Sequence, residues 1–246
     1  MSGFAGDAKA ISVVVVIGAV CAAGLAFVKG QTEGAIKAAR LQETAAAVER
    51  VVPAGCKVRL DEERAGATEC PDYRKKAPAT AGGKPGCFDV YPAYFEDGRL
   101  CAVAVRNSNT EGYGGRIEVL AGFAGLENEE TLVLTRIYVL SHSETPGLGS
   151  LIATAQDKPP EEWGIDRKKV FGLNFRNRVL KDFSFTVKKG TEATEGEVMA
   201  ITAATISSRA VTKAVGESSR WVKENLGAIR EKLAAAPGPS ADGGAQ

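Results

Sequence analysis

The chain has 246 residues and a formal net charge of +1, with 44% hydrophobic and 25% charged residues. This composition is typical of a globular protein, and the near-zero net charge gives no electrostatic reason to expect nucleic acid as a partner. The chain has a single histidine, His142, and no C-x-x-C-H sequence, which argues against a multi-histidine metal site and against attached c-type haem.

The first predicted element is an apolar helix over residues 11–29, which follows a short N-terminal segment, residues 1–10. Its sequence ISVVVVIGAVCAAGLAFV contains no charge, and Lys9 and Lys29 flank it. At about 1.5 Å per residue this helix spans the hydrocarbon core of a bilayer, so the sequence predicts a single transmembrane anchor. The alternative is a cleaved signal peptide with Gly24-Leu25-Ala26 as its small-x-small site. The lysine count leaves the orientation open.

A second helix is predicted for residues 31–52, where apolar residues recur at helical spacing until Pro53 ends the pattern. This helix continues the anchor as a stalk. Residues 61–86 mix charge, proline and glycine and are expected to form a loop.

Strands come next in the chain. Residues 88–95 and 99–106 flank Asp97-Gly98, which is a hairpin signal. Residues 107–115, NSNTEGYGG, are rich in turn formers and predict a loop. Alternating patterns predict further strands, and a short helical turn is expected within residues 159–175. These later strands cover residues 116–121, 131–141 and 182–188.

A helix is predicted from about Ser207 onward, because apolar residues form a stripe at helical spacing. The stripe consists of Val211, Val215, Val222, Leu226, Ile229 and Leu233. Residues 237–246, PGPSADGGAQ, are expected to be a disordered tail. The predicted fold class is α+β: a single domain, residues 30–236, with an antiparallel sheet and packed helices on one N-terminal transmembrane helix.

Four of the five cysteines lie in the polar part of the chain: Cys56, Cys70, Cys87 and Cys101. Their spacing suits neither zinc nor iron–sulfur ligation. If this part is exported, one or two disulfides are expected, and four cysteines allow three pairings.

Two segments, AITAATISSRAV and HSETPGLGS, resemble the FMN-binding subunits of ion-translocating redox complexes, namely the G subunit of the Rnf complex and its relative NqrC. That family has a [ST]-G-A-T-x-[ST] motif, which residues 202–207 match except at Ala203, and an E-T-P-G-L-G loop, which residues 144–149 match without a change. Its G-Y-x-G-x-I segment is similar to residues 112–117. The resemblance covers residues 99–222 and the anchor. One departure is Ala203, where the family has glycine; alanine costs energy there if the backbone φ is positive.

The resemblance implies that Thr205 carries FMN through a phosphoester bond. Thr202, Ala204, Ser207 and Ser208 belong to the same cofactor-binding segment. The first turn of a helix favours an anion, because its N–H groups lack partners and the helix dipole is positive there. The alternative for Thr205 or Ser207 is a simple helix cap.

In the second segment, Glu144 and Thr145 are expected to offer hydrogen bonds near the flavin ring or ribityl chain, and Leu148 to pack against the isoalloxazine. Glycines at 147 and 149 allow the backbone to approach the ring; the structural alternative for the whole segment is a proline–glycine turn after a strand. His142 is interpreted as a strand-end histidine, and Gly114 and Gly115 as a tight turn. Tyr113 either contacts the flavin or fills the core.

The function implied by the resemblance is that of a membrane-anchored electron carrier with covalent FMN, rather than a stand-alone enzyme, in an Rnf-type ferredoxin:NAD oxidoreductase complex. The implied partners are the other subunits of the complex and a flavin transferase that uses FAD. The implied location is the cell membrane, with the main domain on the periplasmic or extracytoplasmic side. Alternatives are an NqrC-like subunit, a flavin-binding sensor, and a structural domain without cofactor.

Overall fold

A computed structural model describes residues 3–58, 88–158, 162, 170–179, 185–190, 194 and 196–234. The predicted loop at residues 61–86, Cys70, Cys87 and the predicted tail at residues 237–246 lie outside the described residues. The chain divides into two compact units, Met1–Thr44 and Ala45–Gln246, and each is described by itself.

The first unit is a helix, and it consists of most of α1 (Gly3–Val51). The predicted anchor and stalk are therefore one continuous helix, which ends two residues before Pro53. Its segment Val14–Ile36 is long and apolar enough to cross a membrane, and none of that window is buried.

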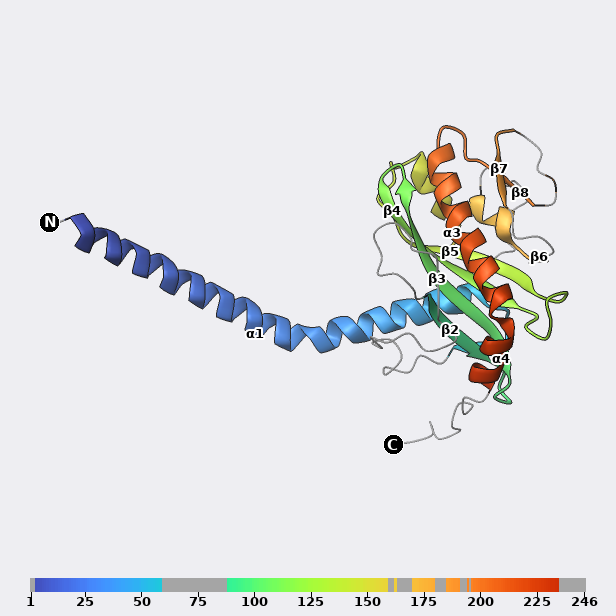
Figure 1. The fold of residues 1–246 in the computed structure, drawn as a ribbon, viewed down its shortest axis with the longest axis horizontal. Coiled ribbons are helices and arrows are strands. Elements are labelled where there is room, and N and C mark those ends of the chain that lie inside the picture. The colour runs from blue at the N-terminus through green and yellow to red at the C-terminus, as the bar shows by residue number, and fades with distance from the viewer. Residues whose placement is uncertain are drawn as a thin grey trace. The chain divides into compact units, whose positions relative to one another are not determined.

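The second unit is built on a six-stranded antiparallel sheet in chain order (Figure 1). Its long central strands are β3 (Leu100–Gly112), β4 (Gly115–Ala124) and β5 (Val133–Ser141). Shorter strands complete it: β1 (Lys57–Val58), β2 (Asp89–Tyr94) and β6 (Arg178–Val179). A separate pair, β7 (Thr186–Lys188) and β8 (Glu197–Met199), is parallel. The antiparallel sheet predicted from the hairpin signals is confirmed.

The two faces of the sheet pack against different helices, because side chains alternate between the faces of a strand. Val103 and Val105 belong to a large cluster with the apolar stripe of α3 (Thr205–Glu224) and α4 (Leu226–Ala234). Ala102 and Ala104 belong to a smaller cluster with the last turns of α1. Two short 3₁₀ helices, η2 (Gly149–Ala153) and η4 (Phe171–Phe175), add to the larger cluster.

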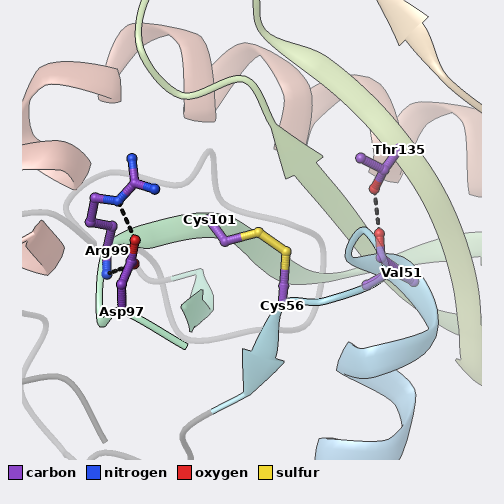
Figure 2. Close-up of a disulfide and its surroundings, with 6 residues drawn as sticks. All are labelled: Val51, Cys56, Asp97, Arg99, Cys101 and Thr135. Carbon is purple, nitrogen blue, oxygen red and sulfur yellow. Dashed lines mark hydrogen bonds and ion pairs between the residues drawn. A yellow bond between two sulfur atoms is a disulfide. The ribbon is translucent and has the colours of Figure 1, made fainter. Parts of the chain in front are cut away.

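The last turn of α1 lies against the backbone of the sheet (Figure 2). The Thr135 hydroxyl donates a hydrogen bond to the Val51 carbonyl, and a Cβ added to Gly122 would lie 2.1 Å from that same oxygen. Just beyond the helix, a disulfide joins Cys56 to Cys101 on β3. The sequence predicted one or two disulfides if this part of the chain is exported. Within the described residues, Cys56 and Cys101 form such a pair.

The prediction of a loop at residues 107–115 is wrong for most of these residues. β3 continues to Gly112, with Asn107 opposite Val119 and Asn109 opposite Ile117 on β4. The asparagines are satisfied within the fold: the Asn107 amide donates to the Ala214 carbonyl at 2.9 Å. Pairing with β4 and packing against α3 therefore override the local turn preference of this sequence.

The C-terminal helix also differs in its boundaries. It begins at Thr205 rather than Ser207, and it is interrupted at Asn225, whose side-chain amide donates to the Trp221 carbonyl at 2.8 Å. All six residues of the predicted apolar stripe are buried. The predicted strand at residues 182–188 is seen only as β7, and the strand predicted for residues 131–141 begins at Val133.

Candidate flavin-attachment site

Three segments that are far apart in the sequence meet at one end of β3 and β4. They are the hairpin turn at residues 112–115, the loop at residues 144–149, and the first turn of α3. Glu144 lies between them with 5% of its surface exposed. Its Oε1 accepts a hydrogen bond from the Gly114 amide at 3.0 Å, and its Oε2 accepts one from the Ser207 hydroxyl at 2.6 Å.

Glycines make room for this arrangement. A Cβ at Gly114 would lie 2.0 Å from the Ser143 carbonyl oxygen, so the hairpin turn and the loop touch through their backbones. A Cβ at Gly149 would lie 2.4 Å from Glu144 Oε2 and 2.8 Å from Ser207 Oγ. The backbone of Ser143 excludes a larger residue at Gly114, and a side chain at Gly149 would displace the side chains of Glu144 and Ser207. The three motifs of the sequence analysis therefore form a single packed cluster.

The hydroxyl groups around the start of α3 have different environments. Ser207 is bound to Glu144, while the buried Ser208 Oγ accepts from the Ile201 amide at 3.0 Å and donates to the Ala204 carbonyl at 2.9 Å. Thr202 is exposed. Thr205 is partly exposed, and within the described part of the chain its hydroxyl has no hydrogen-bond partner.

The simple helix-cap interpretation of these residues does not describe the structure. The N-cap residue of α3 is Ala204, and no side chain caps the helix. Thr205 is instead the first residue of the helix, and Ser207 points to Glu144. The first-turn N–H groups, which an N-cap side chain would ordinarily satisfy, are left for another acceptor.

The residue at the departure from the family motif has an unusual backbone. Ala203 has a φ of 62°, in the left-handed region. For an L-residue with a Cβ this conformation costs about 1–2 kcal/mol, and glycine avoids the cost. The turn into α3 therefore has the geometry that glycine suits, although alanine occupies it.

Apolar side chains surround the cluster at the surface. Tyr113, Leu148 and Ile206 expose 73%, 45% and 50% of their surfaces, and each is the neighbour in sequence of a residue that packs on Glu144. The exposure of Tyr113 excludes the interpretation that it fills the core. These three exposed apolar side chains belong to the three segments that Glu144 joins.

The loop at residues 144–149 is closed by its own hydrogen bonds. The Thr145 carbonyl accepts from the amides of Leu148 and Ser150, both at 3.2 Å, and the Ser150 hydroxyl accepts from the Gly147 amide at 2.9 Å. Gly147 has a positive φ of 73°. The Thr145 side chain is exposed.

His142 directly follows β5 and forms part of the same turn. Its Nδ1 accepts a hydrogen bond from the Glu144 amide at 3.2 Å. The strand-end interpretation of this histidine agrees with its position.

One supporting residue was not singled out from the sequence. Asn174 is fully buried in η4, and its amide donates to the Phe171 carbonyl at 2.9 Å while its Oδ1 accepts from the Met199 amide at 3.0 Å. It thereby fixes the strand that leads to Thr202. The only sequence signal was a polar residue within the apolar stretch FGLNF, and this pattern does not reveal a partner that is 25 positions away.

Arg209 lies one helical turn after Thr205 and is exposed. The first turn of α3 contains no acidic residue. The N-terminus of a helix favours negative charge. The positive charge of Arg209 adds to that preference at the start of α3.

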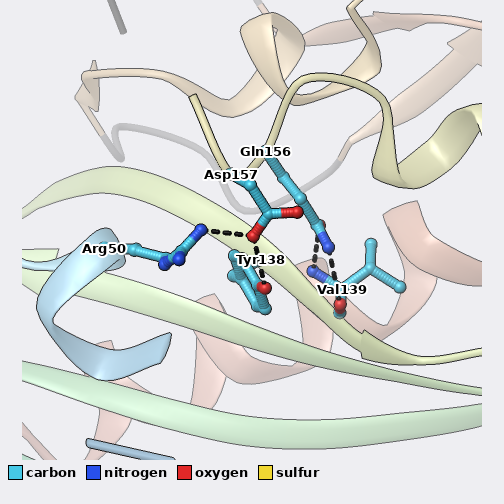
Figure 3. Close-up of polar contacts among 5 residues, drawn as sticks. All are labelled: Arg50, Tyr138, Val139, Gln156 and Asp157. Atoms are coloured by element: carbon cyan, nitrogen blue, oxygen red, sulfur yellow. Dashed lines mark hydrogen bonds and ion pairs between the residues drawn. The ribbon is translucent and has the colours of Figure 1, made fainter. Parts of the chain in front are cut away.

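Residues 149–157 follow this loop in the chain and end beside Tyr138 of β5 (Figure 3). Asp157 accepts hydrogen bonds from Arg50 of α1 and from the Tyr138 hydroxyl, the latter at 2.8 Å. Gln156 pairs with both backbone groups of Val139, at 2.8 and 3.0 Å. The segment that begins at the Glu144 cluster thus ends against the last turns of α1.

The three segments that meet at Glu144 lie within a region that is similar to known FMN-binding proteins. A family model described as an FMN-binding domain matches residues 112–218, which include all three segments. The G subunit of the Na⁺-translocating ferredoxin:NAD⁺ oxidoreductase complex of Acetobacterium woodii is 30% identical over 212 residues, covering 86% of this chain and 88% of that protein.

The G subunit of an ion-translocating oxidoreductase complex from Methanosarcina acetivorans is 31% identical over 219 residues, covering 89% of this chain and 96% of that protein. The crystal structure of NqrC from Shewanella oneidensis aligns with a TM-score of 0.45 and 17% identity over 73% of this chain and 80% of that chain. These two sequence relatives match over most of their length, and the chain belongs to the family of FMN-binding G subunits of ion-translocating oxidoreductase complexes.

Proposed function

We propose that this protein is a membrane-anchored electron-transfer subunit that carries FMN as a phosphoester on Thr205. The observation that carries the proposal is the position of Thr205 at the uncapped start of α3, within the region that matches the FMN-binding domain. Its hydroxyl is partly exposed and has no hydrogen-bond partner among the residues that the structure describes. When bound, the flavin supplies the redox chemistry, and the protein fixes its position and environment.

The residues present fit this group. The flavin phosphate would lie at the first turn of α3, where free N–H groups and the helix dipole favour an anion, with Arg209 one turn away. Thr202 is exposed in the same segment, whereas Ala204 is buried in the core and supports the turn. Leu148 and Thr145 are exposed on the neighbouring loop, so Leu148 is available to pack against the ring and Thr145 to donate a hydrogen bond.

Ser207, Ser208, Gly149 and Glu144 are buried. Their hydrogen bonds and packing support the attachment site from beneath. We therefore assign Thr205 as the attachment residue, the exposed residues to direct contact with the flavin, and the buried ones to its support.

The proposed location is the cell membrane, with α1 as the anchor and the sheet domain on the extracytoplasmic side. Two observations support it. Val14–Ile36 is long and apolar enough to span a bilayer, and Cys56 and Cys101 form a disulfide, which is typical of oxidising compartments. A covalent link is useful on that side of the membrane, because FMN lost there could not readily be replaced.

The proposed partners are the other subunits of an Rnf-type complex that couples ferredoxin and NAD to ion transport, together with a flavin transferase that uses FAD. The name of the relative from Acetobacterium woodii supports a complex that uses ferredoxin and NAD, and the name of the relative from Methanosarcina acetivorans supports an ion-translocating oxidoreductase complex. An NqrC-like complex with quinone as acceptor is the alternative, and assays of the purified native complex with ferredoxin and with quinone separate the two.

The attachment is tested by coexpressing the full chain with a flavin transferase and measuring intact mass and in-gel fluorescence after denaturation. We expect one covalent FMN in the wild type and none in Thr205→Ala. Thr186→Ala is the matched control, because it removes an exposed threonine hydroxyl on β7, outside the three segments of the site, and should retain the flavin. A wild type without covalent flavin, or a Thr205→Ala variant that keeps it, contradicts the proposal.

A further inference from the structure

The strongest unexplained feature of the site is a buried carboxylate. We infer that Glu144 is a positioning residue that holds the flavin attachment point and the exposed apolar side chains of the site in one fixed arrangement. The inference rests on the proposed function for the flavin, but the contacts that carry it belong to the chain alone.

The carboxylate joins three separate segments. Glu144 Oε1 accepts from the Gly114 amide in the hairpin turn, and Glu144 Oε2 accepts from the Ser207 hydroxyl in α3. Its own backbone amide donates to His142 Nδ1, which fixes the start of the loop. Hydrogen bonds to a charged acceptor are roughly twice as strong as those between neutral groups, so these contacts hold the segments firmly.

The packing around Glu144 leaves little room for adjustment. A Cβ at Gly149 would lie within 2.9 Å of three atoms of Glu144 and Ser207. A Cβ at Gly112 would lie 2.6 Å from Glu144 Oε1. The carboxylate therefore fills a space that two glycines leave open, and its removal creates a cavity lined by unpaired donors.

The consequence concerns the distance between Thr205 and the apolar side chains. Ser207 lies two residues after Thr205, Tyr113 immediately precedes Gly114, and Leu148 immediately precedes Gly149. Because Glu144 binds or packs against Ser207, Gly114 and Gly149, it couples the position of the attachment point to those of Tyr113 and Leu148. A tether through a phosphoester fixes only one end of the flavin, so the surrounding segments must be held in place for the ring to have one position.

The hydrogen bond from Ser207 to Glu144 gives the hydroxyls of Ser207 and Thr205 different roles. The Ser207 proton is used in the bond to Glu144, so Ser207 supports the site and Thr205 remains as the free nucleophile. Glu144 acts through Ser207 and Gly114 and need not touch the flavin.

The test compares Glu144→Ala, Glu144→Gln and Glu127→Ala in the full chain, coexpressed with the flavin transferase. Glutamine can keep the three segments joined, because its oxygen accepts from Gly114 and its amide can donate to a rotated Ser207 hydroxyl. Glu127 is the matched control: it is exposed, and among the described residues it makes a hydrogen bond through its backbone carbonyl, from Arg230, and none through its carboxylate.

The first measurement is the fluorescence anisotropy and midpoint potential of the attached flavin, at a temperature where circular dichroism shows each variant to be folded. Glu144→Ala should lower the anisotropy and shift the potential, whereas Glu144→Gln and Glu127→Ala should match the wild type. A purely structural role would change the unfolding midpoint without changing the flavin signals of the folded protein. Unchanged anisotropy and potential in Glu144→Ala overturn the inference.

The second measurement does not depend on the flavin. Hydrogen exchange of the Gly114 amide should be about tenfold faster or more in Glu144→Ala, since local opening loses a bond to a charged acceptor. If the wild type carries no flavin, the proposed function fails, and this exchange rate alone decides whether Glu144 joins the segments. An exchange rate equal to that of the wild type refutes the inference in that case.

Discussion

Ala203 lies two positions before Thr205, and its left-handed backbone, with a φ of 62°, turns the chain into the first residue of α3. The proposed flavin-attachment residue is therefore presented by a turn that alanine adopts with strain. Alanine in place of the family's glycine at position 203 therefore strains the backbone directly before α3.

We expect Ala203→Gly to raise the free energy of unfolding by about 0.5–1 kcal/mol, because relief of the left-handed strain exceeds the entropic cost of glycine. It should also speed flavin transfer to Thr205. Urea unfolding and a time course of in-gel fluorescence measure the two effects.

Ala155→Gly provides the matched control, because Ala155 has a similar φ of 60°. It should stabilise the fold without changing the rate of flavin transfer. An Ala203→Gly variant that is less stable than the wild type would show that the turn is not strained by its Cβ.

Gly114→Ala should destabilise the fold by about 1–3 kcal/mol, the typical cost of inserting a methyl group where no space exists. The new Cβ would lie 2.0 Å from the Ser143 carbonyl, a backbone atom that cannot rotate away. The shift should also weaken the hydrogen bond from the Gly114 amide to Glu144. Thermal and urea unfolding of the full chain check the loss.

The comparison variant is Gly227→Ala in α4, where a Cβ meets nothing within 4 Å. There alanine should stabilise by up to about 1 kcal/mol, because glycine is a poor helix former. If Gly114→Ala is as stable as the wild type, the close approach of the hairpin turn and the loop is not as the structure has it.

The Cys56–Cys101 disulfide closes a loop with a sequence separation of 45. Replacing both cysteines by serine should lower the free energy of unfolding by about 2–4 kcal/mol, mainly because the unfolded chain gains freedom. Non-reducing peptide mapping should recover the two cysteines in one linked pair. Recovery of either Cys56 or Cys101 as a free thiol in exported protein would contradict the pairing.

Cys21→Ser is the control for the stability measurement. It alters a free, exposed cysteine of the other unit and should leave the free energy of unfolding unchanged.

Tyr138 gives the fold a pH dependence at alkaline pH. Partial burial and then the hydrogen bond to Asp157 raise the pKa of the Tyr138 phenol above its ordinary value of 10.0. Well below pH 10 the phenol is protonated in both the folded and the unfolded state. As the pH rises above that ordinary value, the unfolded chain loses this proton first, so the free energy of unfolding falls until the folded phenol also ionises.

We expect Tyr138→Phe to remove this part of the slope. The measurement is urea unfolding between about pH 9 and about pH 11, with Tyr113→Phe, at an exposed tyrosine, as the control. Equal alkaline slopes in the wild type and Tyr138→Phe would show that ionisation of Tyr138 is not linked to folding.

Local patterns predicted much of this protein. Helical spacing indicated α1 and the buried stripe of α3 and α4, and alternation indicated the central strands, because these signals depend on neighbouring residues alone. The prediction failed at residues 107–112, where turn-forming residues are in a strand. Their ladder to β4 and the bond from Asn107 to α3 lie outside any local window, so the sequence pattern could not reveal them.

The sequence by itself determined the family, through two short segments that are recognisable residue by residue, and it pointed to Thr205 as the attachment residue. Only the tertiary structure decided how the segments meet: that Glu144 joins Gly114 and Ser207, that Ala203 has a left-handed backbone, and that Cys56 pairs with Cys101. The physical reason is distance along the chain. A motif is local and can be read in order, whereas a buried carboxylate acquires its role from donors that the fold brings to it.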